Sequence, residues 1–170
     1  YLQPHTVELL VRSAPLHDIG KVGIPDYVLL KPGKLTPEEW VVMQTHARLG
    51  RDAIEAAERD AEETVEFLAI AKEIAHYHHE KWDGSGYPER LAGDGIPISA
   101  RLMALADVFD ALICKRVYKP AMPLEQATAI ILDGRGAHFD PDVVDAFART
   151  ATTFAEIAAR YSDDADDETS

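Results

Sequence analysis

The side chains best suited to chemistry fall in two clusters that lie far apart in the sequence. The first is a His-Asp pair, His17 and Asp18, with Lys21 three residues further on. The second is a pair of adjacent histidines, His78 and His79, which leads into a Gly- and Pro-rich segment. Imidazole and carboxylate groups are natural ligands of first-row transition metals. The two clusters therefore indicate a metal site assembled from distant parts of the chain.

Two further residues extend this set of ligands. His46 follows apolar Val42 by four residues, so it can share the buried face of a helix. Asp107 lies in a strongly apolar run, where a carboxylate is costly unless it is paired or bound to a metal. Each residue also has a simpler explanation: His46 as a satisfied core histidine, Asp18 as a turn former, Asp107 as the partner of a buried arginine. Because all of these explanations would have to hold separately, a metal site is the better interpretation.

Four histidines and two aspartates exceed the needs of one tetrahedral ion. The predicted ligands are His17, Asp18, His46, His78, His79 and Asp107. This set suits two five- or six-coordinate ions, with Asp18 as the bridging carboxylate. Mixed imidazole and carboxylate ligands fit Fe, Mn, Ni or Zn, and the sequence does not choose among them. The other three histidines, His5, His76 and His138, are better explained as structural or exposed residues.

The elements that must position these side chains are helices. We expect six of them, at 6–16, 36–57, 64–80, 99–115, 124–132 and 140–161, with loops at 20–35 and 82–98 and a charged connection at 58–63. Thr36 and Glu39 form a capping-box pattern at one helix start. Ser99 and Asp140 are further expected caps. No segment shows sustained strand alternation. The fold class is therefore all-α, a compact helical bundle with metal ligands facing its interior.

Composition limits the kinds of partner. The chain has 170 residues and a net charge of −13, so its surface repels polymeric nucleic acid. No apolar run is long enough to span a bilayer. The single cysteine, Cys114, fits a reducing cytoplasm. We expect one domain over residues 1–161, followed by an acidic disordered tail over 162–170.

Four motifs closely resemble those of the HD-GYP family, the bacterial cyclic di-GMP phosphodiesterases within the HD phosphohydrolases. They are LHDIGKVGIPD at 16–26, LLKPGKLTPEEW at 29–40, HHEKWDGSGYP at 78–88 and ADVFDAL at 106–112. The resemblance runs from about Leu9 to Phe147, which is most of the chain.

The resemblance implies hydrolysis of cyclic di-GMP to pGpG, and onward to GMP, at a site with two metals and room for a third. The six predicted ligands match the family's metal ligands, with Asp18 bridging, and Lys21 matches its lysine near the scissile phosphate. Tyr87, Arg116 and Lys119 match residues that hold the nucleotide. An aromatic ring can stack on guanine, and arginine can grip phosphate with two hydrogen bonds. Asp110, on the same helical face as Asp107, is an expected second carboxylate for orienting a ligand or accepting from the substrate.

The resemblance also implies partners and exposes one departure. The Gly-Tyr-Pro loop is expected to contact GGDEF-domain proteins, and the segment before His17 resembles versions fused to a receiver domain of a response regulator. Family members usually carry a further histidine ligand on an earlier helix. This chain begins sixteen residues before His17, and we expect that helix to lie outside the sequence given. Two alternatives stay open: a non-catalytic module that binds cyclic di-GMP or a protein, and an HD phosphohydrolase acting on mononucleotides.

Overall fold

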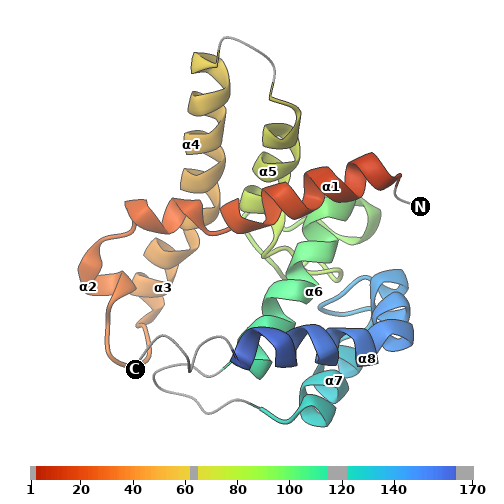
Figure 1. The fold of residues 1–170 in the computed structure, drawn as a ribbon. Helices are drawn as coiled ribbons and strands as arrows, with labels where there is room; N and C mark the ends of the chain where they lie inside the picture. The colour runs from red at the N-terminus through yellow and green to blue at the C-terminus, as the bar shows by residue number, and fades with distance from the viewer. Residues whose placement is uncertain (1–2, 62–64, 115–121, 164–170) are drawn as a thin grey trace. The chain divides into compact units, whose positions relative to one another are not determined.

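The computed structural model describes residues 3–61, 65–114 and 122–163, and helices are the regular elements within them (Figure 1). The α-helices are α1 (Pro4–Ser13), α2 (Asp26–Leu29), α3 (Pro37–Gln44), α4 (His46–Asp60), α5 (Glu66–Tyr77), α6 (Ile98–Ile113), α7 (Leu124–Asp133) and α8 (Pro141–Asp163). Three 3₁₀ turns accompany them: η1 (Ala14–Leu16), η2 (Ile19–Gly23) and η3 (Gly93–Gly95). The prediction of an all-α fold is confirmed. None of the described helices has the length and apolar character required to cross a membrane.

The expected helix over 36–57 is in fact two helices, which meet at Thr45. At this break the Thr45 hydroxyl donates to the carbonyl of Val42 at 2.7 Å, and the His46 ring lies 2.7 Å from the carbonyl of Met43. Side chains that hydrogen-bond to nearby carbonyls compete with the helical ladder. Two smaller expectations were also wrong. Residues 26–29 are helical inside the predicted loop, and α4 continues to Asp60.

The predicted helix caps have mixed outcomes. The capping box is confirmed, because Glu39 N donates to Thr36 Oγ1 and Thr36 N donates to the Glu39 carboxylate. Asp140 also caps its helix, accepting from the backbone N–H of Asp142 at 2.8 Å. Ser99 is not a cap, since α6 has already begun at Ile98; its hydroxyl instead donates to Glu73 at 2.6 Å.

The chain forms two compact units, Tyr1–Met103 and Ala104–Ser170, and α6 crosses the boundary between them. In the first unit α4 packs along α5, and α1 packs against α5 (Figure 1). Its core includes Ile54, Ala71 and Ala75, with apolar side chains of η1 and α5 around them. Small residues on α5 let the neighbouring helices approach closely.

The second unit has its own apolar centre. Here α7 packs against α8. The rings of Phe109, Phe147 and Phe154 contact one another at centroid distances of 5.0–5.4 Å. Ile131 of α7 and Val144 of α8 are fully buried. The unit is therefore held by aromatic and branched aliphatic contacts between helices.

A backbone-to-backbone contact at Gly20 fixes η2 against α4. A Cβ at Gly20 would overlap the carbonyl oxygen of His46 and the backbone nitrogen of Gly50. A Cβ at Gly50 would lie 3.4 Å from the Ala75 side chain, so this contact between η2 and α4 also lies against α5. This contact sets the distance between Asp18, just before η2, and His46, at the start of α4.

We predict that Gly20→Ala destabilises the protein by about 3 kcal/mol or more, because the overlap is with backbone atoms that cannot turn aside. Chemical denaturation monitored by circular dichroism measures the change. Gly95→Ala is the matched control, since a Cβ there meets nothing within 4 Å. Equal unfolding free energies for the two variants would contradict this account of the packing.

Candidate metal centre and adjoining cavity

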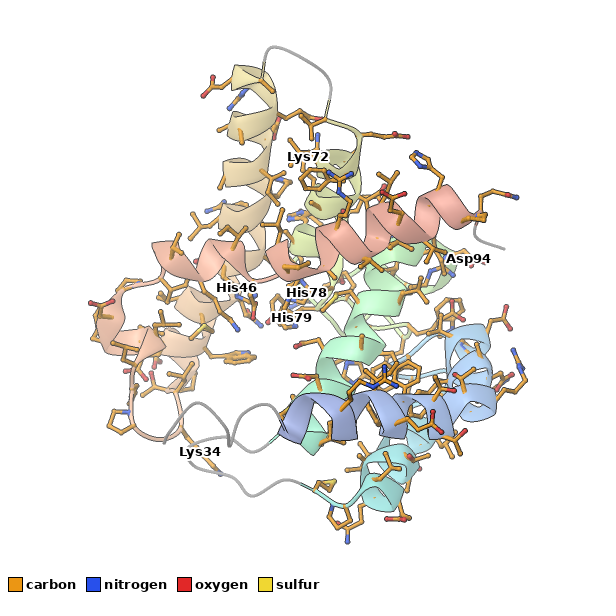
Figure 2. All side chains as sticks on the ribbon, viewed as in Figure 1. Lys34, His46, Lys72, His78, His79 and Asp94 are labelled. Atoms are coloured by element: carbon orange, nitrogen blue, oxygen red, sulfur yellow. The ribbon has the colours of Figure 1, made fainter. Side chains whose placement is uncertain are left out.

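Four of the six predicted ligands converge in the first unit. The nearest ligand atoms of Asp18, His46, His78 and His79 all lie within 4.8 Å of one another. Asp18 precedes η2, His46 is the first residue of α4, and the histidine pair directly follows α5. Figure 2 shows the three histidines gathered at one place in the fold. Residues that are distant in sequence thus form one cluster, as a metal site requires.

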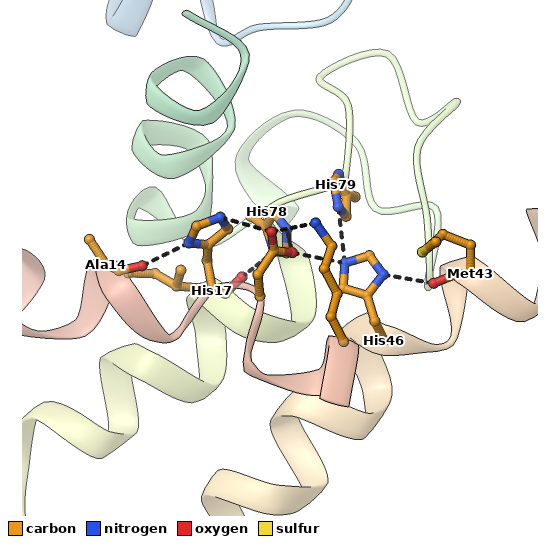
Figure 3. A network of polar contacts seen from close by, with 9 residues as sticks. Ala14, His17, Met43, His46, His78 and His79 are labelled. Carbon is orange, nitrogen blue, oxygen red and sulfur yellow. Dashed lines mark hydrogen bonds and ion pairs between the residues drawn. The ribbon is translucent and has the colours of Figure 1, made fainter. Parts of the chain in front are cut away.

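Backbone carbonyls orient the histidine rings, as Figure 3 shows. The Nδ1 atoms lie 2.9 Å from the Ala14 carbonyl in His17, 2.7 Å from the Met43 carbonyl in His46 and 2.8 Å from the Ile74 carbonyl in His78. A carbonyl oxygen can only accept, so Nδ1 carries the proton in each ring. The Nε2 lone pair is then available to a metal, which is the usual arrangement for a ligating histidine.

The atoms that face one another in the cluster are mainly acceptors. The Nε2 atoms of His46 and His78 lie 3.5 and 3.9 Å from Asp18 Oδ1. Asp18 Oδ1 and His78 Nε2 are both buried and lack a hydrogen-bond partner among the described residues. An unsatisfied buried acceptor costs about 1–3 kcal/mol. A divalent cation would satisfy these lone pairs, so the residues present fit a metal.

The local electrostatics keep the cluster ready to bind a cation. Burial lowers the pKa of His78 to about 4, and burial also lowers the pKa values of His46 and His79. These rings are therefore neutral at neutral pH. Burial acts to raise the pKa of Asp18, but its side-chain contacts with His17 and Lys21 outweigh burial and hold that pKa below its usual range. Asp18 is therefore a carboxylate.

Two predicted site residues lie beside the cluster without joining its four ligand atoms. His17 Nε2 is 3.3 Å from Asp18 Oδ2, and the His17 ring packs edge-on against His78. Lys21 Nζ is 2.5 Å from the same carboxylate oxygen. Asp18 therefore turns Oδ2 toward His17 and Lys21, and Oδ1 toward His46 and His78. A ligand role for His17 stays a prediction.

Four other predicted site residues belong to the second unit or lie outside the described residues. Asp107 and Asp110 lie on α6 in the second unit. Asp107 is half-buried, whereas Asp110 is exposed and accepts from the Cys114 thiol at 3.2 Å. Arg116 and Lys119 lie outside the described residues. The roles expected for these four side chains stay predictions.

A buried carboxylate, Glu80, organises the Gly-Tyr-Pro loop. It accepts hydrogen bonds from the backbone N–H groups of Glu89, at 2.7 Å, and Leu91, at 3.1 Å. Burial raises the pKa of Glu80, although these N–H groups act to lower it. Gly86 packs onto the backbone at Glu80 and its neighbours so closely that a Cβ would overlap it. The loop is thereby folded back onto the histidine pair.

This fold-back places Tyr87 against the cluster. Tyr87 N donates to the carbonyl of His79 at 3.2 Å, and the two rings stack with centroids 4.7 Å apart. Trp40 packs edge-on against the Tyr87 ring. One face of Tyr87 therefore lies on a candidate metal ligand, and stacking on a base would use the other face.

The same loop lines a cavity of about 700 Å³. Its walls are one stripe of α3 and α4, with Val41, Gln44, Thr45 and Arg48, and the loop residues 84–90. Glu80, Arg48 and Arg90 were not among the site residues predicted from the sequence. The spacing 41, 44, 45 and 48 could have revealed the stripe, because such positions share a helical face. The positions of Glu80 and Arg90 depend on contacts within the loop.

Comparison with known proteins agrees with the geometry. A family model described as HD domain matches residues 3–143. A cyclic di-GMP phosphodiesterase of Vibrio cholerae is 62% identical over 162 residues, 95% of this chain and 33% of the relative. A 3'3'-cGAMP-specific phosphodiesterase 2 of the same organism is 46% identical over 156 residues, covering 92% of this chain and 29% of the relative.

A third relative is the cyclic di-GMP phosphodiesterase response regulator RpfG of Xanthomonas campestris pv. campestris. It is 44% identical over 161 residues, 95% of this chain and 41% of the relative. The chain thus spans about a third of the length of the relatives it matches. The chain belongs to the HD domain family, and its histidine pair and Gly-Tyr-Pro loop agree with the HD-GYP branch of that family.

Proposed function

We propose that this chain is the catalytic part of a metal-dependent phosphodiesterase that hydrolyses cyclic di-GMP to pGpG, and onward to GMP. One observation carries the proposal. A carboxylate and three neutral imidazoles bring their ligand atoms within 4.8 Å, and two of these buried acceptors lack a hydrogen-bond partner among the described residues. The names of two similar proteins support cyclic di-GMP as the substrate.

The proposed cofactor is a pair of divalent transition-metal ions, Fe, Mn or Ni, with Zn as a further option and room for a third ion. Asp18, His46, His78 and His79 would hold them, joined by His17 and Asp107. Bound metals lower the pKa of water and neutralise charge on phosphate oxygens, which is the chemistry that a phosphodiester demands.

Protein side chains supply the other parts of the proposed reaction. We assign Lys21, whose Nζ lies 2.5 Å from Asp18, to donating a proton or a hydrogen bond to the leaving oxygen. We assign Tyr87 to stacking on a guanine base, Arg116 and Lys119 to phosphate binding, and Asp110 to orientation of the ligand. The assignments of Tyr87, Arg116 and Lys119 follow from the family resemblance, and that of Asp110 follows from its place on the same helical face as Asp107.

The proposal extends to the cellular setting. We infer a cytoplasmic protein whose Gly-Tyr-Pro loop contacts GGDEF-domain proteins and which carries a receiver domain before this chain. The similarity to the response regulator of Xanthomonas campestris supports the receiver domain. Neither a membrane nor polymeric nucleic acid is among the proposed partners, in keeping with the net charge of −13.

We predict that Mn(II) raises the melting temperature of the full-length protein by roughly 5 to 10 °C when the free metal reaches about a hundred times its dissociation constant. Asp18→Asn and His78→Gln should lose most of this shift, because the first removes the negative charge of the unpartnered Asp18 carboxylate and the second removes the unpartnered imidazole nitrogen of His78. Asp26→Asn, an exposed carboxylate on α2, is the control and should keep it. Differential scanning calorimetry measures the shifts. An equal shift in all four proteins would place the metal elsewhere.

Hydrolysis is tested by incubating the metal-loaded full-length protein with cyclic di-GMP and separating the products by chromatography. We expect pGpG with Fe(II), Mn(II) or Ni(II), and a fall in rate of about a hundredfold or more in Asp18→Asn, because the proposed bridge is lost. Asp26→Asn should retain the wild-type rate. Binding of cyclic di-GMP without turnover under every metal would instead identify a non-catalytic module.

We predict that Lys21→Met lowers kcat by about a hundredfold, because it removes the proposed hydrogen-bond donor to the reacting phosphate. Lys34→Met is the matched control; Figure 2 shows Lys34 well away from the histidines. Steady-state kinetics and metal analysis are run together. Wild-type kcat in Lys21→Met excludes the assignment, whereas lost metal would mean that Lys21 acts by positioning Asp18.

A further inference from the structure

We propose that Arg48 and Arg90 form a second anion subsite, which takes the phosphate of the cyclic dinucleotide that is not being cut. The inference rests on the proposed function and deepens it. Arg48 projects from α4 and Arg90 from the Gly-Tyr-Pro loop, and both line the cavity of about 700 Å³. Small-molecule sites commonly have volumes of roughly 300–1,000 Å³. The cavity is therefore large enough for part of a dinucleotide.

The charges at this cavity contrast with those on the rest of the protein. Both arginines are exposed, and neither forms an ion pair with a described residue. Arg51, Arg101 and Arg135 do form ion pairs, with Asp52, Asp94 and Asp145. Arg59 also has no ion pair among the described residues, but Arg48 and Arg90 differ from it because both line one cavity. In a chain with a net charge of −13, two guanidinium groups beside one carboxylate in a cavity lining favour an anionic ligand.

The carboxylate in the cavity lining is already engaged. Glu89 lines the cavity, and its Oε1 lies 3.2 Å from Nε2 of buried His76. The same ring nitrogen lies 3.3 Å from the Arg51 guanidinium. Glu89 is therefore engaged with His76, and the two guanidinium groups of the lining outnumber its single carboxylate.

The backbone at Arg90 is a second, independent observation. Arg90 has φ of 58°, in the left-handed region that costs a non-glycine residue about 1–2 kcal/mol. Elsewhere in this loop the same region is occupied by Gly84, with φ of 80°, and Gly93, with φ of 54°. A glycine would suit the backbone at position 90 better, so the turn itself does not require an arginine.

The cavity and the ligand cluster share a wall. Tyr87 lines the cavity and stacks on His79, and Thr45, also in the lining, directly precedes His46. A cyclic dinucleotide carries two phosphates on one ring. With one phosphate at the cluster, the other must lie nearby, and the guanidinium groups are the cationic side chains of this cavity lining. Arginine binds phosphate oxygens through paired hydrogen bonds.

The test measures binding of a hydrolysis-resistant bis-phosphorothioate analogue of cyclic di-GMP to the metal-loaded full-length protein by calorimetry. We expect Arg48→Ala and Arg90→Gly each to weaken binding about tenfold or more. Arg59→Ala, an exposed arginine near the far end of α4, is the control and should leave Kd unchanged. Arg90→Gly should keep or raise the melting temperature, because it relieves the backbone while removing the guanidinium.

Each outcome decides between the claims. Unchanged Kd in either Arg48→Ala or Arg90→Gly overturns the paired subsite. The analogue of 3'3'-cGAMP should lose affinity by the same factor, since it has the same phosphates; a loss confined to cyclic di-GMP would assign the arginines to a base. Binding that depends on the arginines but is not followed by hydrolysis supports the subsite and contradicts the proposed function. Hydrolysis with wild-type KM in both arginine variants supports the proposed function and contradicts the subsite. A wild-type protein that neither binds nor hydrolyses the dinucleotide contradicts both proposals.

Discussion

The structure depends on the crowding of buried acceptors around Asp18. A carboxylate oxygen and three imidazole nitrogens lie within 4.8 Å of one another, and two of them lack a donor among the described residues. Lone pairs that face one another away from water are unfavourable unless a cation or a proton lies between them. Burial lowers the pKa values of the imidazoles, so the rings take up no additional proton at neutral pH, and the 3.1 Å contact between the Nε2 atoms of His46 and His79 satisfies only one pair of the atoms. The cluster therefore makes physical sense as the interior of a metal site.

Two backbone devices hold these acceptors together against that repulsion. Gly20 allows η2 to approach α4 at a distance that only glycine permits. The break at Thr45 makes His46 the first residue of α4. The carbonyl of Met43, near the break, orients the His46 ring. The helix break thus contributes both the direction of α4 and the tautomer of a ligand. The same few peptide groups therefore set both the position of the His46 ring and the nitrogen that carries its proton.

The sequence predicted those parts of the fold that depend on local signals. The capping box at Thr36 and the Asp140 cap rest on residues three or fewer positions apart, and both formed. The break at Thr45 carries no Gly or Pro signal, so it could not be read in advance. Glu80 escaped prediction for a different reason: its partners are loop N–H groups around nine to eleven residues away. Residue type and spacing identified the candidate ligands, whereas the convergence of their ligand atoms within 4.8 Å depends on the tertiary structure.

The Gly-Tyr-Pro loop couples the proposed chemistry to the proposed recognition. Glu80 anchors the loop from within, and the same loop presents Tyr87 to His79 and Arg90 to the cavity. A shift of the loop would therefore move a nucleotide contact and a neighbour of the metal ligands together. Since Glu80 directly follows the histidine pair, its position is tied to the ligands through one peptide link. The candidate metal ligands and the proposed substrate contacts of the loop thus belong to one segment, which buried Glu80 holds together through hydrogen bonds to its backbone.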